Sequence, residues 1–175
     1  TLDRSSAASD VYKRQLPAVE AGSLGPWPKR WRAVVLEPGH SPSTALAIAL
    51  KAIGIVSTGS PLEIVERISE DVAAREEGVI LFVDQCEELV TVADQNSVAH
   101  FVEVISLLAE RGQVGIKVVV GIRRDILDSV LGLGRLGSIV ARGILLVEPL
   151  TAASWEAVVE QSLGAYGYSF EDEAL

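Results

Sequence analysis

Acidic side chains follow directly after an apolar segment in the middle of the chain, at Asp84, Glu87 and Glu88. The segment, residues 79–83, is apolar at every position, which is typical of a strand buried on both faces of a sheet. A carboxylate at the end of such a strand can hold the water shell of Mg²⁺, and a second carboxylate nearby can deprotonate an attacking water. Asp84 is therefore a candidate metal-binding residue, acting through water, and Glu87 or Glu88 is a candidate general base.

A second apolar segment, residues 116–122, is followed by Arg123. Neighbouring parallel strands end at the same edge of a sheet, so the Arg123 side chain can reach the ligand that Asp84 holds and contact a terminal phosphate. Two plainer interpretations stand beside these. The acids can complement the dipole of a following helix, and Arg123 can form a surface ion pair with Asp125 or Asp128.

Two further features are weaker candidates for chemistry. Residues 132–137 match G-x-G-x-x-G, but a dinucleotide-binding loop must follow a strand and begin a helix, whereas this one follows a helical segment. We expect a flexible loop there. Cys86 lies among acids that raise the pKa of its thiol, so we expect a small packed residue and not a nucleophile.

The composition limits the classes of partner. The chain has 175 residues, of which 49% are hydrophobic, enough for one sizeable core or for one domain and part of another. Its net charge of −9 opposes non-specific binding to nucleic acid or anionic membranes, because both require a basic surface. Apolar runs stay shorter than the ~18 residues of a membrane-spanning helix, and the single cysteine excludes an internal disulfide. We expect a cytoplasmic protein without nucleic-acid or membrane partners.

Apolar periodicity predicts strands that alternate with helices along the chain. The clearest helix start is Ser60-Pro61-Leu62-Glu63, where serine is the N-cap, proline occupies the first turn and glutamate completes a capping box. The alternation predicts an α/β fold, a parallel sheet with helices on both faces. The expected strands are residues 32–36, 79–83, 116–122 and 143–147, and the expected helices are residues 43–53, 60–76, 96–110, 125–131 and 151–163.

These residues, taken in order, resemble the novel STAND NTPases, signal-transducing P-loop ATPases related to the AAA and NACHT groups. The family's magnesium-binding strand ends in D-Q-F-E-E-L, and residues 84–89 read D-Q-C-E-E-L. A later strand ends in R-x-D-F-L, and residues 123–127 read R-R-D-I-L. Weaker matches in the same order are L-P-A at residues 16–18, W-R-A-V-V-L-E-P-G at residues 31–39, V-E-P-L at residues 147–150 and G-Y-S-F-E at residues 167–171.

The resemblance covers residues 16–175 and implies an α/β fold of the P-loop NTPase kind. A truncated core would span residues 16–148, and residues 149–175 would begin a helical lid that closes over the nucleotide. Exchange between ADP and ATP would then switch an effector domain attached to the same parent chain. Repeat domains such as WD40 or TPR and an ATP-dependent homo-oligomer are the further partners that the family implies.

The same resemblance implies ATP and Mg²⁺ as the cofactors of the intact protein. Asp84 would hold Mg²⁺ through water, and Arg123 would contact the γ-phosphate. Glu87 or Glu88 would activate the hydrolytic water.

The chain departs from the family pattern at three points. Cys86 stands where phenylalanine is usual, and Glu37 stands where a basic residue is usual. No G-x-x-x-x-G-K-[ST] phosphate loop occurs in the 175 residues, and by the family layout it would precede Leu16. Residues 1–15 resemble a peptide translated from sequencing-adapter DNA, and the sequence contains no methionine. We therefore expect a fragment in which residues 1–15 replace the first strand and its loop, and a genuine disordered arm is the alternative.

Without that loop we expect the fragment to be inactive and to bind little nucleotide, because the backbone N–H groups and the lysine of the phosphate site would be missing. The rival hypothesis is a nucleotide-independent α/β scaffold for protein interaction. A third hypothesis, a dinucleotide-binding oxidoreductase, requires a strand just before Gly132.

The missing first strand also affects the expected sheet. In the related AAA layout it lies between the strands of residues 116–122 and 143–147, so these two strands should pair directly or leave an exposed gap.

Overall fold

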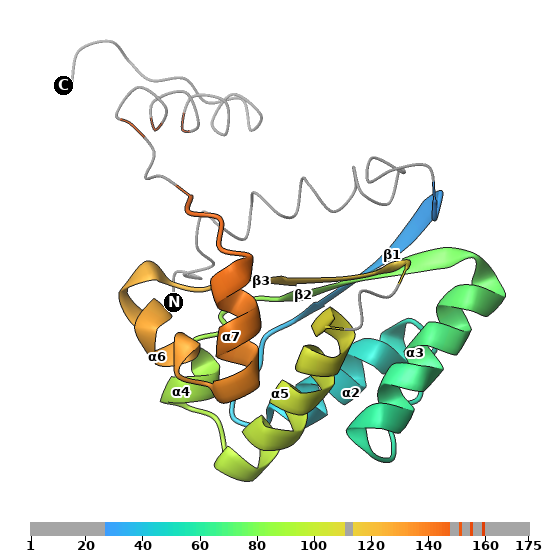
Figure 1. The fold of residues 1–175 in the computed structure, drawn as a ribbon, viewed down its shortest axis with the longest axis horizontal. Coiled ribbons are helices and arrows are strands. Elements are labelled where there is room, and N and C mark those ends of the chain that lie inside the picture. The colour runs from blue at the N-terminus through green and yellow to red at the C-terminus, as the bar shows by residue number, and fades with distance from the viewer. Residues whose placement is uncertain (1–26, 111–113, 148–150, 152–154, 156–158, 160–175) are drawn as a thin grey trace. The chain divides into compact units, whose positions relative to one another are not determined.

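The computed structural model describes residues 27–110, 114–147, 151, 155 and 159 (Figure 1). The chain divides into two units, Thr1–Gly143 and Ile144–Leu175, and every element with described bounds belongs to the first. The segment expected to come from adapter DNA and the helix end expected near Leu16 lie outside the described residues, as does most of the helix expected at residues 151–163.

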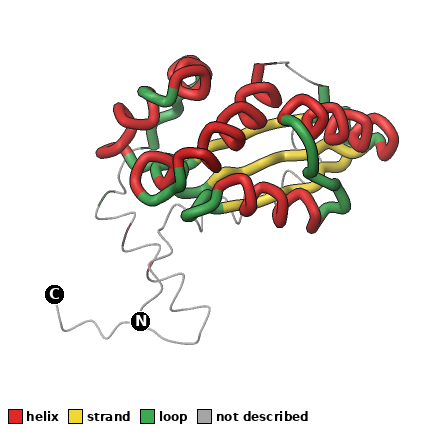
Figure 2. Tube along the Cα trace, turned by 90° about the horizontal axis from the view of Figure 1, so that it is seen from below, coloured by secondary structure: helices red, strands yellow, loops and turns green. Residues whose placement is uncertain are grey.

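Three parallel strands lie side by side in the order β1, β2, β3 (Figure 2). They are β1 (Arg30–Leu36), β2 (Glu77–Val83) and β3 (Ile116–Val120). The register pairs Leu36 with Val83 and Val83 with Val120, so the three strands end level with one another. Their carboxyl ends therefore form one edge of the sheet, and the prediction of an α/β fold with a parallel sheet is confirmed.

Helices α2 (Pro42–Ala52), α3 (Pro61–Arg75) and α5 (Gln95–Glu110) pack on one face of the sheet, below the strands in Figure 1. Alternate strand residues point to this face and join the buried side chains of the helices in one apolar core. The strand residues that contribute are Val34, Leu36, Val79, Leu81, Val83, Ile116, Val118 and Val120. The sequence predicts helices on both faces, and in the described part of the chain the three that pack closely on the strands share one face.

The local sequence explains where α3 begins. The Ser60 hydroxyl accepts the N–H of Glu63 at 3.4 Å, and the Glu63 carboxylate accepts the N–H of Ser60 at 2.7 Å. The expected capping box is thus confirmed, and two orphan N–H groups of the first turn are satisfied. Ile64 and Ile68 follow at helical spacing and are buried in the core, so one helix face is held against the sheet.

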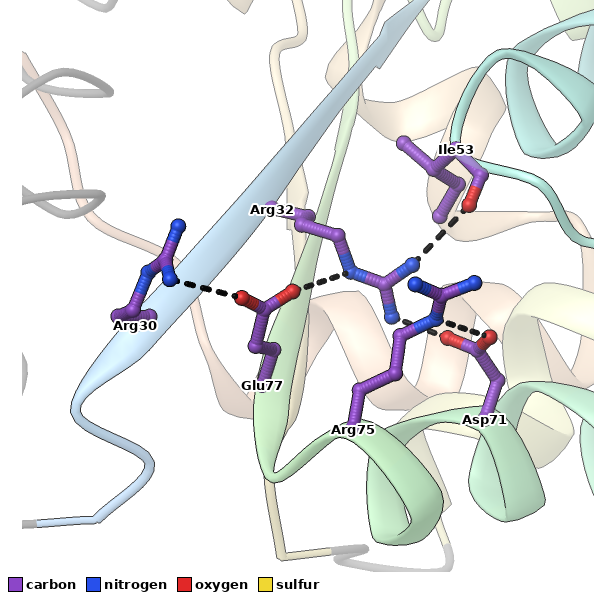
Figure 3. Close-up of polar contacts among 6 residues, drawn as sticks. All are labelled: Arg30, Arg32, Ile53, Asp71, Arg75 and Glu77. Atoms are coloured by element: carbon purple, nitrogen blue, oxygen red, sulfur yellow. Dashed lines mark hydrogen bonds and ion pairs between the residues drawn. The ribbon is translucent and has the colours of Figure 1, made fainter.

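An ion-pair network joins the amino ends of β1 and β2 to α3 (Figure 3). Arg32 on β1 forms ion pairs with Asp71 of α3 and with Glu77 of β2, the latter at 3.5 Å. Arg75 pairs with Asp71 at 2.8 Å. Arg30 pairs with Glu77 at 3.5 Å. We call these five residues the amino-edge network, because they lie at the end of the sheet opposite the carboxyl edge.

The prediction of a strand at residues 143–147 is wrong. Helix α7 (Gly134–Arg142) precedes these residues, and residues 144–147 follow it without strand pairing. Leu145 and Val147 are 86% and 87% exposed. An apolar sequence supplies suitable side chains, but a strand also needs a neighbour for its backbone N–H and C=O groups. Within the described ranges this segment has no such neighbour, so direct pairing with β3 is also wrong.

Helix α7 replaces part of the loop expected at residues 132–137. Two short helices, α4 (Glu88–Thr91) and α6 (Leu127–Leu131), and the 3-10 turn η1 (Arg124–Ile126) complete the described elements. The sequence predicts a helix near α6 but not α4, because four residues are too few to show an apolar period. None of the described helices combines the length and the apolar character needed to cross a membrane.

Candidate functional site

The acidic turn, residues 84–88, continues directly from β2 at the carboxyl edge of the sheet. Asp84 and Glu87 are each 7% exposed, whereas Gln85 between them is exposed. The Gln85 N–H donates to Oδ1 of Asp84 at 3.0 Å. Gln85 has a φ of +51°, a left-handed conformation that costs a non-glycine residue about 1 kcal/mol. The turn therefore holds two carboxylates away from bulk water, at a cost in desolvation and in backbone strain.

Two hydrogen bonds fix the acidic turn on its β1 side. The Asp84 N–H donates to the Leu36 carbonyl at 2.9 Å, which extends the contact between β1 and β2 beyond the last strand residues. The Gly39 N–H donates to Oε2 of Glu88 at 2.7 Å. The Glu88 carboxylate is therefore engaged with the loop that follows β1.

On its β3 side the turn is held by two further hydrogen bonds. The Cys86 N–H donates to the Gly121 carbonyl at 2.9 Å, and the Arg123 N–H donates to Oε2 of Glu87 at 3.3 Å. Gly121 also leaves room for the acids, because a Cβ at this position would lie only 3.2 Å from Oδ1 of Asp84. The structure thus brings both carboxylates and the backbone of Arg123 to one edge, where sequence analysis expected these residues to meet.

The Arg123 guanidinium is paired with Asp125. Its Nε and Nη2 donate to the two carboxylate oxygens at 3.2 and 2.7 Å. The two side chains are 67% and 61% exposed, so this is a surface ion pair of the kind that contributes ~0–1 kcal/mol. Of the two interpretations of Arg123, the structure shows the surface ion pair with Asp125.

Cys86, within the acidic turn, is fully buried. Burial raises the pKa of its thiol to about 12, and the negative charge of Glu87 adds to the effect. The sequence predicts the direction of this shift but attributes it to the acids, whereas burial is the larger cause. The thiol stays protonated at neutral pH, as befits a packed residue and not a nucleophile.

The G-x-G-x-x-G motif at residues 132–137 has a packing explanation. Helix α6 precedes it, so the strand that a dinucleotide-binding loop requires is absent from residues 127–131. Gly134 has a φ of +51° at the start of α7, and a Cβ on Gly137 would lie 2.0 Å from the Leu131 carbonyl oxygen. These glycines allow α7 to approach the end of α6. The hypothesis of a dinucleotide-binding oxidoreductase is therefore wrong.

The side chains of the acidic turn suit a hard cation that keeps most of its water. Asp84 offers a buried carboxylate, and Mg²⁺ commonly binds through one or two carboxylates while retaining several waters. Among the described residues, no group of three or more His, Cys, Asp or Glu is arranged to enclose a metal ion. The residues present therefore fit Mg²⁺ held through water on one carboxylate, and not an all-protein metal cage.

Sequence analysis does not find two glycines of this edge, Gly39 and Gly121. Gly39 has a φ of +57° and gives its N–H to Glu88, while Gly121 leaves room beside Asp84. Each glycine lies just beyond the end of an apolar strand. That position is the signal that can reveal such residues, since glycine near a strand end often marks a close approach of the backbone to another group.

Comparisons with known proteins identify the family of the chain. No curated protein matches the chain significantly. The family model described as novel STAND NTPase 1 matches residues 16–175, which is nearly the whole chain and includes β1, β2, β3 and the acidic turn. The chain therefore belongs to the novel STAND NTPase 1 family.

Proposed function

We propose that the acidic turn is the magnesium-facing, water-activating edge of an ATP-driven signalling switch. Family membership supports a nucleotide-binding signalling NTPase, and the choice of ATP, of Mg²⁺ and of an attached effector domain is the finer content of the proposal. The observation that carries it is the burial of Asp84 and Glu87 in one turn at the carboxyl edge of a parallel sheet. Carboxylates are costly to bury, and such residues gather at functional sites.

Asp84 and Glu87 take different roles in this proposal. Asp84 holds the water shell of Mg²⁺, which neutralises charge on the β- and γ-phosphates when it is bound. Glu87 accepts the proton of the attacking water, and its hydrogen bond to the Arg123 N–H orients the carboxylate for that task. Glu88 is the weaker candidate for the base, because its carboxylate already accepts the short hydrogen bond from Gly39.

Arg123 contacts the γ-phosphate in the proposed nucleotide-bound state. Its backbone N–H donates to Glu87, so Arg123 is held at the carboxyl edge of the sheet. Its present partner, Asp125, is exposed, and a surface pair contributes too little to hold the guanidinium against a phosphate. Phosphate recognition by a guanidinium is bidentate and charge-assisted, so exchange of Asp125 for the nucleotide is favourable.

The test uses an extended chain that has a phosphate loop. A strand, a G-x-x-x-x-G-K-[ST] loop and a helix from a family member replace residues 1–15, and ATP hydrolysis is measured with Mg²⁺. Glu87→Gln is expected to lower kcat about 10²–10³-fold while Mg·ATP still binds, because the base is lost and Asp84 remains. Asp84→Ala is expected to abolish the Mg²⁺-dependent part of ATP binding, and Glu66→Ala, an exposed acid on α3, is the control.

The unextended chain provides the complementary measurement. Calorimetric titration of residues 1–175 with Mg·ATP is expected to show no micromolar binding, because no phosphate loop is present in the sequence. Micromolar affinity there would contradict this part of the proposal. If the extended chain neither binds nor hydrolyses ATP, the scaffold hypothesis replaces the ATPase one.

A further inference from the structure

The proposed reaction does not use Glu88, yet Glu88 accepts a short hydrogen bond from outside the acidic turn. Its Oε2 accepts the Gly39 N–H at 2.7 Å, across 49 residues of sequence. A hydrogen bond to an ionised carboxylate is roughly twice as strong as one between neutral groups. The distance and the charge of this contact therefore suit a hydrogen bond that holds the segment around Gly39 to the acidic turn.

Gly39 belongs to the β1 loop, residues 37–41, which makes further contacts with the segment after the acidic turn. The His40 Nδ1–H donates to the Val92 carbonyl at 3.0 Å, just beyond α4. The Asp94 N–H donates to the His40 carbonyl at 2.9 Å. The β1 loop is thus attached to residues on both ends of α4, and Glu88 provides the attachment nearest to Glu87.

The same connection continues from the β1 loop into α2 and α5. The Ser43 N–H donates to the Ser97 hydroxyl at 3.0 Å, and the Ser43 hydroxyl donates to the Ser97 carbonyl at 2.8 Å. Ser43 lies in the first turn of α2 and Ser97 in the first turn of α5. A displacement of the β1 loop would therefore act on the starts of two helices that pack on the sheet.

We propose that Glu88 is a positioning residue that clamps the β1 loop to the acidic turn and thereby fixes Glu87. The acidic turn then bridges three strand ends, because it continues from β2, Glu88 ties it to the β1 loop, and Glu87 ties it to Arg123 beyond β3. Without Glu88, the turn keeps the Asp84 N–H bond to the Leu36 carbonyl at 2.9 Å and the Arg123 N–H bond to Glu87 at 3.3 Å, but it loses its side-chain contact with the β1 loop. The role of Glu87 in this statement rests on the proposed function, whereas the clamp itself does not.

Amide hydrogen exchange in the chain of residues 1–175 tests the clamp directly. In Glu88→Ala, the amides of Gly39 and Asp94 are expected to exchange about tenfold faster or more, because the β1 loop detaches. In Glu88→Gln, which keeps an acceptor oxygen, both rates are expected to stay within about threefold of the original. The Val79 amide, which donates to the Gly115 carbonyl at 2.8 Å in the sheet, reports whether the fold is intact.

Each result of this exchange experiment decides the matter. Unchanged rates at Gly39 and Asp94 in Glu88→Ala overturn the proposal, and so does a change confined to Gly39, since the loop would then not move as a unit. If Val79 also exchanges faster, the variant has lost its fold. Glu88→Asp, which shortens the side chain and keeps its charge, is then measured instead: faster exchange at Gly39 and Asp94 with Val79 unchanged supports the clamp, and unchanged rates at Gly39 and Asp94 overturn it.

Hydrolysis by the extended chain separates the clamp from the proposed function. Glu88→Ala is expected to lower kcat about tenfold, and Glu88→Gln is expected to restore most of it, since positioning needs an acceptor and not a base. A Glu88→Gln variant as inactive as Glu87→Gln, with Gly39 still protected, would overturn the positioning role. Full activity of Glu87→Gln would instead refute the proposed function and leave the clamp standing.

Discussion

The two edges of the sheet hold their acids in opposite ways. At the amino edge, Asp71 and Glu77 each contact two guanidinium groups of the amino-edge network. At the carboxyl edge, Glu87 is more deeply buried, and the hydrogen bond to its carboxylate comes from a backbone N–H at 3.3 Å. A guanidinium neutralises a carboxylate, whereas a backbone dipole only partly offsets the cost of its burial. The amino edge thus pairs its acids with cations, whereas the Glu87 carboxylate at the carboxyl edge accepts a backbone N–H.

The contrast between the two edges does not extend to the backbone. Each edge contains one non-glycine residue in a left-handed conformation, Glu76 with a φ of +55° between Arg75 and Glu77, and Gln85 with a φ of +51° in the acidic turn. What separates the two edges is the burial of the carboxylates, since Asp84 and Glu87 are each 7% exposed whereas the side chains of Asp71 and Glu77 are 18% and 22% exposed. The cation-paired acids and the proposed functional acids therefore lie at opposite ends of the same strands.

The largest expected effect comes from breaking the amino edge at Arg32. Arg32→Ala is expected to lower the free energy of unfolding by about 2 kcal/mol, because Asp71 and Glu77 each lose a guanidinium while remaining only 18% and 22% exposed. Urea denaturation measures the loss, and Arg142→Ala, at an exposed helix end, is the control. Equal stabilities of the two variants would show that the network contributes nothing to the fold.

A smaller effect should appear when Asp71 is titrated. Burial alone would raise the pKa of Asp71, but hydrogen bonds from Arg32 and Arg75 outweigh it and hold the pKa below its ordinary value. A lowered pKa means that the stabilising contribution is present above the unfolded pKa, about 3.9, and is lost as the pH falls through the lower folded value.

Asp71→Asn should therefore be about 1 kcal/mol less stable than the original chain at pH 6, and the difference should shrink towards zero in acid. Unfolding curves of both proteins at a series of pH values measure this convergence. A difference that stays constant down to pH 2 would mean that the Asp71 charge is not what the arginines stabilise.

The smallest effect, and one of opposite sign, is expected from the same acid-to-amide change at the carboxyl edge. Glu87→Gln removes a buried charge and keeps an oxygen that can accept the Arg123 N–H. The free energy of unfolding should stay level or rise by up to about 1 kcal/mol, because functional sites are commonly held at the expense of stability. A loss as large as that of Asp71→Asn would remove the distinction between the two edges.

The sequence predicts elements well where local chemistry determines them. The capping box at Ser60 and Glu63 fixes the start of α3, and the unbroken apolar run of residues 79–83 corresponds to the buried central strand. The predictions that proved wrong also have physical causes. Residues 144–147 have the side chains of a strand but lack a described neighbour for their backbone groups, and α7 forms in spite of glycines that suggest a loop.

The candidate site divides in the same way. Asp84 and Glu87 can be found from sequence, because an acid after an apolar run is a local pattern. The contact of Glu88 with Gly39 and that of Arg32 with Asp71 join residues 49 and 39 positions apart, and they depend on the pairing of β1 with β2 and on the packing of α3. The sequence leaves Glu87 and Glu88 as equal candidates for the proposed base, and the long-range contact of Glu88 with Gly39 is what distinguishes them.

The left-handed backbone of Gln85 has a consequence for anyone who would engineer a more heat-resistant version of this chain. Glycine accepts such a conformation without strain, so Gln85→Gly looks like an easy gain of up to about 1 kcal/mol. The same change would let the turn sample many more shapes and would loosen the spacing between its acids. A search for thermostabilising substitutions should therefore leave this turn alone and begin on the helices.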